Sequence, residues 1–341
     1  MLALADLRRP IIGAPMAGGV STPELAAAVS AAGGLGFLAA GYLPVATVVD
    51  QVRSARALGA EALGVNLFVP EATPPDLDAA RAYRRTLLPL AERLGVELPD
   101  PRPDDDGWDA KVAALLDDPV PVVSFTFGLA PADVVARLSD VGTCVLATVV
   151  TAEDAARAAA TGVDGLVVQG PGAGGHRATT SAQGVPPDQP LPDLLAAVRA
   201  ATDLPIVATG GLSDAASVAR ALELADAVQV GTALLDAEEA GTNPTYRAAL
   251  RDPRFTRTTL TRAFSGRVAR GLDNRFIREH LDAPAVYPAV NQLTGRLRRA
   301  AGASGDADGL SLWAGTGWRA VRGGPAATIV DALLAGPTED A

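Results

Sequence analysis

The feature that most constrains the fold of this chain is a series of short apolar segments, each separated from the next by a segment of helical character. The apolar segments cover residues 10–16, 35–40, 63–69, 120–127, 143–149, 165–170, 205–211 and 227–234. Because these runs are almost continuously apolar, they predict parallel strands that are covered on both faces. Eight such strands alternating with helices predict an α/β fold of the TIM-barrel type, a closed (β/α)₈ barrel. A doubly wound sheet is the alternative, but its glycine-rich fingerprint would follow the first strand, whereas the strongest glycine patterns here come late.

Helices are expected between the apolar segments. The first begins in the sequence Ser-Thr-Pro-Glu at residues 21–24, a capping-box pattern with proline near the first helical turn. The predicted helices cover residues 22–32, 45–58, 152–161, 191–201 and 215–224, and a further helix starts near Pro131. Residues 25–49 carry no charge, but their glycines and a proline favour helix, strand and helix over a membrane span.

Two segments interrupt the regular alternation. Residues 70–119 replace one helix by a longer excursion, which contains a Pro/Asp-rich surface loop between two helices. Residues 236–320 follow the last strand and are expected to form a small helical subdomain over the C-terminal mouth of the barrel. The predicted domains are therefore a barrel of residues 1–235, this subdomain, and a C-terminal helix and tail of residues 321–341.

Charge and cysteine content exclude several kinds of partner. The chain has 29 basic and 39 acidic residues and a net charge of −10, and no basic patch is long enough to follow a nucleic-acid backbone. Its single cysteine, Cys144, excludes a disulfide framework and a Cys-rich metal site, and its apolar neighbours predict a buried core residue. The N-terminus has no signal-peptide pattern, so we expect a cytoplasmic protein. The oligomeric state is not readable from the sequence.

Two glycine patterns in the second half of the chain predict a phosphate site. Gly210-Gly211 and Gly231-Thr232 each end an apolar run. A strand that ends in glycine lets the backbone approach a phosphate, and a helix that follows directs its N–H groups at the anion. In barrel enzymes such sites lie after strands 7 and 8, where a flavin phosphate would be held. Ordinary turn glycines are the alternative for either pair.

The two histidines of the chain have different surroundings. His176 lies just beyond the sixth apolar run, in a loop too rich in glycine to be explained by packing. A histidine at the C-terminal end of a barrel strand is typical of a catalytic residue, although a loop histidine bonded to the backbone is the alternative. His280 has charged neighbours at helical spacing and is expected to be a solvated helix residue.

Polar side chains also interrupt two of the predicted strands, at Asn66 and Gln169. An unpaired buried amide costs about 1–3 kcal/mol, so each of these side chains needs a partner. The polar edge, ribityl chain or phosphate of a flavin would supply one. A hydrogen bond within the barrel is the alternative for each.

Taken together, these segments resemble the nitronate monooxygenase family, formerly called 2-nitropropane dioxygenases. The resemblance covers nearly the whole chain and rests on PIIGAPMAGGVSTPEL, GGLGFLAAGY, GVNLF, VSFTFGLAP, QGPGAGGHR, ATGGLSDAASVARAL, QVGTALL, AFSGRVARG and LWAGTG. It implies FMN at the barrel mouth, and the active-site histidine of the family falls on His176. The residues that match the family's FMN contacts are Met16, Asn66, Gln169, Gly174, Gly175, Gly210, Gly211, Gln229, Gly231 and Thr232.

The resemblance also implies a reaction, the oxidation of an alkyl nitronate by FMN and O₂ to a carbonyl compound and nitrite without a nicotinamide cofactor. His176 would place a positive charge or a hydrogen bond beside the nitronate oxygens, or act as a base towards a neutral nitroalkane. Two positions raise questions. Gly172 stands where many relatives have an acidic residue, which leaves the bracing of the loop open. Lys111, the only lysine, lies in the excursion, so an anionic flavin would rely on backbone N–H groups, His176 or an arginine unless the excursion brings Lys111 into the site.

Other functions are also compatible with these residues. The same scaffold resembles FMN-dependent enoyl-acyl-carrier-protein reductases and flavin quinone reductases, which consume NADH or NADPH. A non-redox barrel would use the glycine pairs for the phosphate of its substrate, but the strand ends lack the lysine or paired carboxylates that such enzymes usually need. A flavin-binding protein without catalytic activity would leave His176 without a role.

Overall fold

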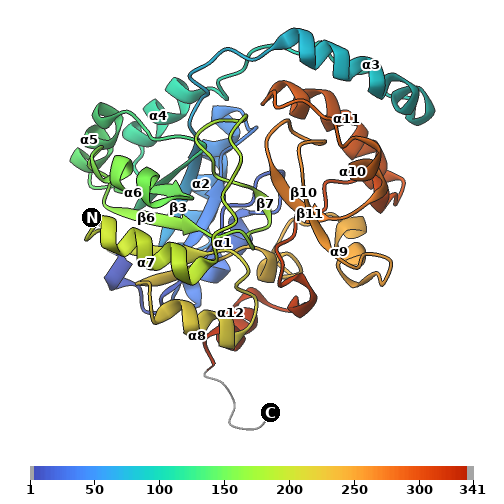
Figure 1. Cartoon of the computed structure of the whole chain (residues 1–341). Helices are drawn as coiled ribbons and strands as arrows, with labels where there is room; N and C mark the ends of the chain where they lie inside the picture. Colours follow the sequence, from blue (N-terminus) through green and yellow to red (C-terminus); the bar gives the residue numbers. More distant parts are fainter. Residues whose placement is uncertain (1–3, 336–341) are drawn as a thin grey trace.

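The computed structural model describes residues 4–335, and within them eight parallel strands form a barrel (Figure 1). The strands run in the order β1-β9-β8-β6-β5-β4-β3-β2, and Gly13 N–H at one edge donates to Leu35 O at the other over 2.9 Å, which closes the ring. The predicted TIM-barrel fold is therefore confirmed, with one strand in each predicted apolar segment. The strands are β1 Ile11–Gly13, β2 Gly36–Ala39, β3 Leu63–Phe68, β4 Val122–Thr126, β5 Cys144–Val149, β6 Gly165–Gln169, β8 Ile206–Thr209 and β9 Ala227–Val230.

Helices surround the barrel, and the last helix of the chain completes this outer layer. The Thr22 side chain caps the first helix by accepting from Leu25 N–H, so the cap lies one residue later than Ser21, the N-cap that the capping-box pattern predicts. The last helix packs between the helices that follow β1 and β8, so the 236–320 segment is an insertion between the final strand and the final helix. The helices are α1 Pro23–Ala31, α2 Val45–Ala57, α4 Trp108–Asp117, α5 Ala132–Asp140, α6 Ala152–Ala159, α7 Leu191–Ala201, α8 Ala215–Leu222 and α12 Ala326–Leu334.

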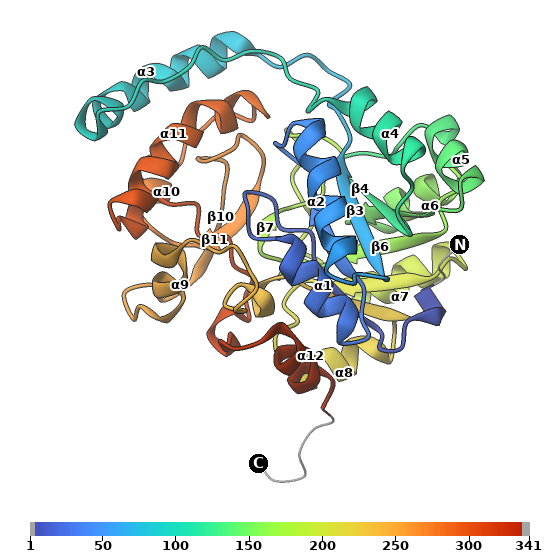
Figure 2. The same ribbon diagram turned by 180° about the vertical axis from the view of Figure 1, so that it is seen from behind.

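The inserted segment forms a cap beside the barrel mouth (Figures 1 and 2). It holds the helices α9 Pro244–Arg251, α10 Arg275–Glu279 and α11 Ala289–Ala303. It also holds a small antiparallel sheet of β10 Thr258–Thr261 and β11 Ala269–Leu272, which the sequence analysis does not predict. The third strand of this sheet is β7, Gly175–His176, from the loop after β6, and Ala269 pairs with His176. The cap sheet therefore fixes the backbone of the histidine loop.

The first part of the excursion after β3 joins the cap, whereas its last helix, α4, packs on the barrel. Its first helix, α3 Leu77–Leu94, lies along α11 in both views. The Tyr83 hydroxyl donates to Ala263 O over 2.8 Å, and α3 shares an apolar cluster with residues of α10 and α11. The Pro/Asp-rich segment forms the predicted loop between α3 and α4. No helix within residues 4–335 is both long and apolar enough to cross a membrane.

The barrel interior differs between its two ends. Near the N-terminal ends of the strands, apolar side chains such as Ile12, Phe37, Val122 and Leu146 form a buried cluster, which includes Cys144 as predicted. Near the C-terminal ends the inward-facing side chains are polar, and these line the cavity described next. The fold thus closes one end of the barrel by packing and leaves the other for a ligand.

Candidate active site

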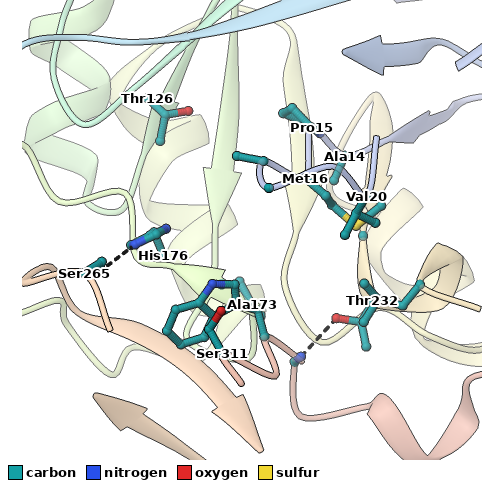
Figure 3. Close-up of a pocket in the computed structure, with 18 of the residues that line it drawn as sticks. Ala14, Pro15, Met16, Val20, Thr126, Ala173, His176, Thr232, Ser265 and Ser311 are labelled. Carbon is teal, nitrogen blue, oxygen red and sulfur yellow. Dashed lines mark hydrogen bonds between the residues drawn. The ribbon is translucent and has the colours of Figure 1, made fainter. Parts of the chain in front are cut away.

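A cavity of about 710 Å³ lies between the C-terminal ends of the strands and the cap. This volume is within the usual range for small-molecule and cofactor sites. Every site residue predicted from the sequence lines it, namely Met16, Asn66, Gln169, Gly174, Gly175, His176, Gly210, Gly211, Gln229, Gly231 and Thr232. Figure 3 shows Met16 and Thr232 on one side of the cavity and His176 with Ser265 on the other.

The amide oxygen of Asn66 is held by the barrel itself. It accepts hydrogen bonds from Ser124 Oγ over 2.8 Å and from Thr126 Oγ1 over 2.9 Å, on the adjacent strand β4. This is the internal hydrogen bond that the sequence analysis left open. Both contacts fall on the oxygen, so they fix the orientation of the amide and leave its NH₂ group to face a ligand.

Gln169 has protein partners at both ends of its amide. Its Nε2 donates to His176 O over 3.0 Å, and its Oε1 accepts from Ala178 N–H over 2.9 Å. The internal alternative therefore applies here as well, because the amide holds the backbone on either side of the histidine loop. Gln169, at the end of β6, thus helps to position His176.

His176 is surrounded by aromatic rings and hydrogen bonded to the cap. Its Nε2 lies 2.8 Å from Ser265 Oγ, and its ring makes edge or tilted contacts with Phe127, Tyr287 and Trp313 at centroid distances of 5.4, 6.2 and 5.6 Å. The Ser265 hydroxyl also lies 3.1 Å from Arg267 O, and its one proton serves either that carbonyl or the imidazole. The site therefore orients the ring from several directions.

The electrostatic environment keeps His176 neutral. Burial, reinforced by the positive charges of Arg267 and Arg298, lowers its pKa to about 3. The imidazole is then uncharged at neutral pH. This changes one expectation from the sequence, because the positive charge near a substrate comes from arginines, and His176 offers a hydrogen bond or an unprotonated ring nitrogen.

Arg267 is fully buried behind the aromatic wall. Its guanidinium forms an ion pair with Glu71 and donates to Thr179 O over 2.6 Å. It also lies 4.2 Å from the centroid of the Phe127 ring, a cation–π contact. Since Phe127 touches His176, Arg267 links the excursion residue Glu71 to the wall of the site.

Three loops approach one another closely at the glycine side of the cavity. Gly210 and Gly211 have φ of 110° and 80°, which favours glycine, and a Cβ on Gly210 would lie 2.9 Å from Gly170 O. A Cβ on Gly172 would lie 2.8 Å from Thr316 Oγ1, while Gly172 O accepts from Thr316 N–H over 3.0 Å. The loop at Gly172 is thus braced by the segment after β11, and a side chain at this position would require Thr316 to move.

The helices that follow the two glycine pairs differ from the phosphate-binding helix N-termini that the sequence predicts. Gly231 is followed by a short 3₁₀ helix, Thr232–Leu234, and the N-terminus of α8 is capped by the side chain of Asp214. Thr232 Oγ1 accepts from Gly315 N–H over 3.0 Å, so its hydroxyl joins the barrel to the cap (Figure 3). A phosphate here would depend on backbone N–H groups more than on a helix dipole.

Lys111 does not line the cavity. Its ammonium donates to Ala40 O over 2.9 Å and pairs with Asp106 over 2.8 Å, and Asp106 in turn accepts from Tyr42 N–H over 2.8 Å. The excursion therefore uses its lysine to fix the loop after β2. An anionic ligand must draw its positive charge from other groups.

His280 is not the solvated residue that its charged neighbours predict. It is half-buried, its Nδ1 lies 2.8 Å from Phe276 O, and its ring stacks on Phe276 at 4.2 Å and meets the edge of Tyr83 at 5.8 Å. Because α10 is short and ends at this position, the side chain folds back onto the apolar cluster of the cap.

Several residues of the cavity wall were not predicted as site residues. Ser265 and Trp313 lie in the segments AFSGRVARG and LWAGTG, which carried the family resemblance without a residue role. Tyr42 and Arg298 also line the cavity. A lone tyrosine after a strand and one arginine among several in a helix carry no spacing that would distinguish them from surface residues.

Comparisons with known proteins agree on one family. The model of the family described as nitronate monooxygenase matches residues 2–336. A nitronate monooxygenase from Pseudomonas aeruginosa is 39% identical over 349 residues, which covers 97% of this chain and 97% of that protein. The crystal structure of nitroalkane oxidase from Streptomyces ansochromogenes is 48% identical with a TM-score of 0.93, covering 97% of this chain and 96% of that one. FabK from Thermotoga maritima is more distant, at 25% identity and a TM-score of 0.73 over 97% of this chain and 93% of that one.

Proposed function

The chain belongs to the nitronate monooxygenase family of flavin-dependent oxidoreductases, and from that premise we propose that it uses FMN and O₂ to oxidise alkyl nitronates to carbonyl compounds and nitrite. The observation that carries the proposal is the neutral, oriented His176 in a cavity whose opposite wall is built from glycine backbone and amides. We further propose a small nitronate and O₂ as its partners and the cytoplasm as its location.

The cavity fits FMN in volume and in the character of its walls. Gly210, Gly211 and Gly231 present backbone that can approach a phosphate, and at Gly210 a Cβ would collide with neighbouring backbone. Asn66 would direct its NH₂ group at the flavin ring, while Met16 would pack against it. The remaining predicted FMN contacts, Gln169, Gly174, Gly175, Gln229 and Thr232, would complete the wall.

When bound, FMN supplies the reversible electron transfer that an anionic nitronate and O₂ require. The chain's own residues bind and orient the substrate. His176 would donate a hydrogen bond to a nitronate, or accept the α-proton of a neutral nitroalkane at the ring nitrogen that Ser265 does not engage. The rings of Phe127, Tyr287 and Trp313 would exclude water from this position.

The test is the product analysis of the purified holoenzyme. Heating should release FMN and not FAD, and mixing with a preformed nitronate in air should consume O₂ and form nitrite without NADH or NADPH. NADH consumption that depends on an enoyl thioester or a quinone, with no nitrite formed, would instead support the reductase alternative.

A further inference from the structure

Two polar groups of the cavity have no part in the function proposed so far, the Tyr42 hydroxyl and the Arg298 guanidinium. We propose that these two groups bind the two oxygens of the substrate's nitro or nitronate group and so hold its carbon towards His176. The inference rests on the proposed function, which it extends to the recognition of the substrate.

Tyr42 is held in an unfavourable backbone conformation, and its hydroxyl oxygen is buried without a hydrogen-bond partner of normal geometry in the described part of the chain. Its φ is 68°, a region that bulky residues rarely adopt and that marks functional sites when the surroundings enforce it. The enforcing contact is the Asp106 carboxylate, which accepts from Tyr42 N–H and is itself paired with the buried Lys111. The hydroxyl oxygen is buried near Tyr287, but among residues 4–335 it makes no hydrogen bond of normal geometry. Burial raises its pKa to about 12, so it remains a hydrogen-bond donor at neutral pH.

Arg298 is a cation without an anion. It lies on α11, and its Nη2 donates to Asn291 Oδ1 over 2.6 Å. No carboxylate within residues 4–335 forms an ion pair with it, and its buried Nε has no hydrogen-bond partner there. Arg267 differs, because Glu71 neutralises it. A partly buried guanidinium without a counter-charge is costly, and an anionic ligand in the cavity would remove that cost.

The two side chains and His176 lie close to one another. Tyr42 and His176 both contact the Tyr287 ring, at centroid distances of 6.3 and 6.2 Å. The charge of Arg298 lowers the pKa of both Tyr42 and His176, as expected for a cation close to each. All three side chains line the same cavity.

This arrangement matches the charge distribution of the substrate. A nitronate shares its negative charge between two oxygens on one nitrogen, which suits a guanidinium and a hydroxyl as paired donors. With a neutral nitroalkane, the C–H bond breaks and its proton moves to His176. The C–H electron pair forms the C=N bond, and the negative charge moves to the oxygens that Arg298 and Tyr42 hold.

The first experiment measures anion binding without turnover. Propionate, whose carboxylate resembles the nitronate group in shape and charge, is titrated into oxidised holoenzyme while the flavin absorbance is recorded. We expect Arg298→Gln to weaken propionate binding about ten- to a hundredfold and Tyr42→Phe about three- to tenfold, with Arg298→Lys intermediate. Propionamide, which is neutral, should lose far less binding than propionate in the two Arg298 variants. The matched controls, Tyr83→Phe in the cap core and Arg85→Gln on the exposed face of α3, should bind propionate as the wild type does.

The second experiment separates this inference from the proposed function by kinetics. With a preformed nitronate, Arg298→Gln should raise KM and largely preserve kcat, because the charge is present before and during the reaction. With the neutral nitroalkane it should also lower kcat, because the charge develops only as the proton leaves. Unchanged propionate binding and unchanged KM in Arg298→Gln would overturn the inference, as would loss of FMN from that variant. A wild type that binds propionate but forms no nitrite would contradict the proposed function and leave the anion site standing.

Discussion

The two walls of the cavity are lined by different kinds of chemical groups. The barrel wall consists of glycine backbone and of amides held by neighbouring strands, as at Gly210 and Asn66. The cap wall consists of aromatic rings, a neutral histidine and two arginines with different partners, as at His176, Arg267 and Arg298. Backbone groups and amides suit a cofactor that stays bound through every turnover. Charged and aromatic side chains instead control the charge of a group that reacts. We therefore assign the cofactor to the barrel wall and the chemistry to the cap wall.

The largest expected effect is at the barrel wall, in Gly231→Asp. Its carboxylate would oppose the FMN phosphate, so the protein should purify without flavin and without activity. Flavin content and nitrite formation are measured together. Gly231→Ala is the matched control, because the nearest atoms to its Cβ would be side-chain atoms of Ala14 and Met16 at 3.3–3.7 Å, and it should keep FMN. Full flavin occupancy in Gly231→Asp would end the assignment of the cofactor to this wall.

The next effect is at the cap wall, in His176→Asn. This variant should keep FMN, since the glycine loops are unchanged, but lose about 10²–10⁴-fold in kcat/KM, the usual scale for a positioned acid–base or electrostatic residue. The loss should be greater for a neutral nitroalkane, whose proton must be removed first. Wild-type kinetics on both substrates would contradict a chemical role for the cap wall.

A third prediction concerns stability and the buried ion pair between the excursion and the cap. Glu71→Gln leaves the fully buried Arg267 without its counter-charge and should lower the free energy of unfolding by about 3–5 kcal/mol, measured by urea denaturation. The control is Glu97→Gln. Glu97 is exposed and lies 3.9 Å from Arg296, so this change should cost only about 0–1 kcal/mol. Equal effects of the two substitutions would show that the cap wall does not depend on its buried charge.

The smallest expected effect is a pH dependence. Since the pKa of His176 is lowered to about 3 in the folded protein and is about 6.5 in an unfolded chain, the unfolded chain binds the extra proton between these values. Stability is therefore complete above about pH 6.5 and falls with pH below it, by up to about 1.4 kcal/mol per pH unit. Urea unfolding at pH 7 and pH 5 should show a larger loss for the wild type than for His176→Asn. Identical losses would mean that His176 is protonated in the folded state.

The sequence predicts the barrel wall much better than the cap wall. Strands that end in glycine or an amide leave a pattern in a single segment, so Gly210 and Asn66 can be found before any fold is known. The cap wall and the loop after β2 depend on contacts between distant segments. Tyr42 is held by Asp106 and Lys111 of the excursion, and His176 by Ser265 of the cap sheet. The neutral state of His176 and the solitary charge of Arg298 are consequences of packing, which no local spacing records.

The most direct test of the central claim is the reaction of the bound flavin under anaerobic conditions. The account predicts that a preformed nitronate changes the absorbance of the oxidised flavin within a turnover time, that admitting O₂ restores it with release of nitrite, and that NADH leaves the flavin oxidised on prolonged exposure. Rapid bleaching of the flavin by NADH, with no nitrite formed from the nitronate in air, would contradict it.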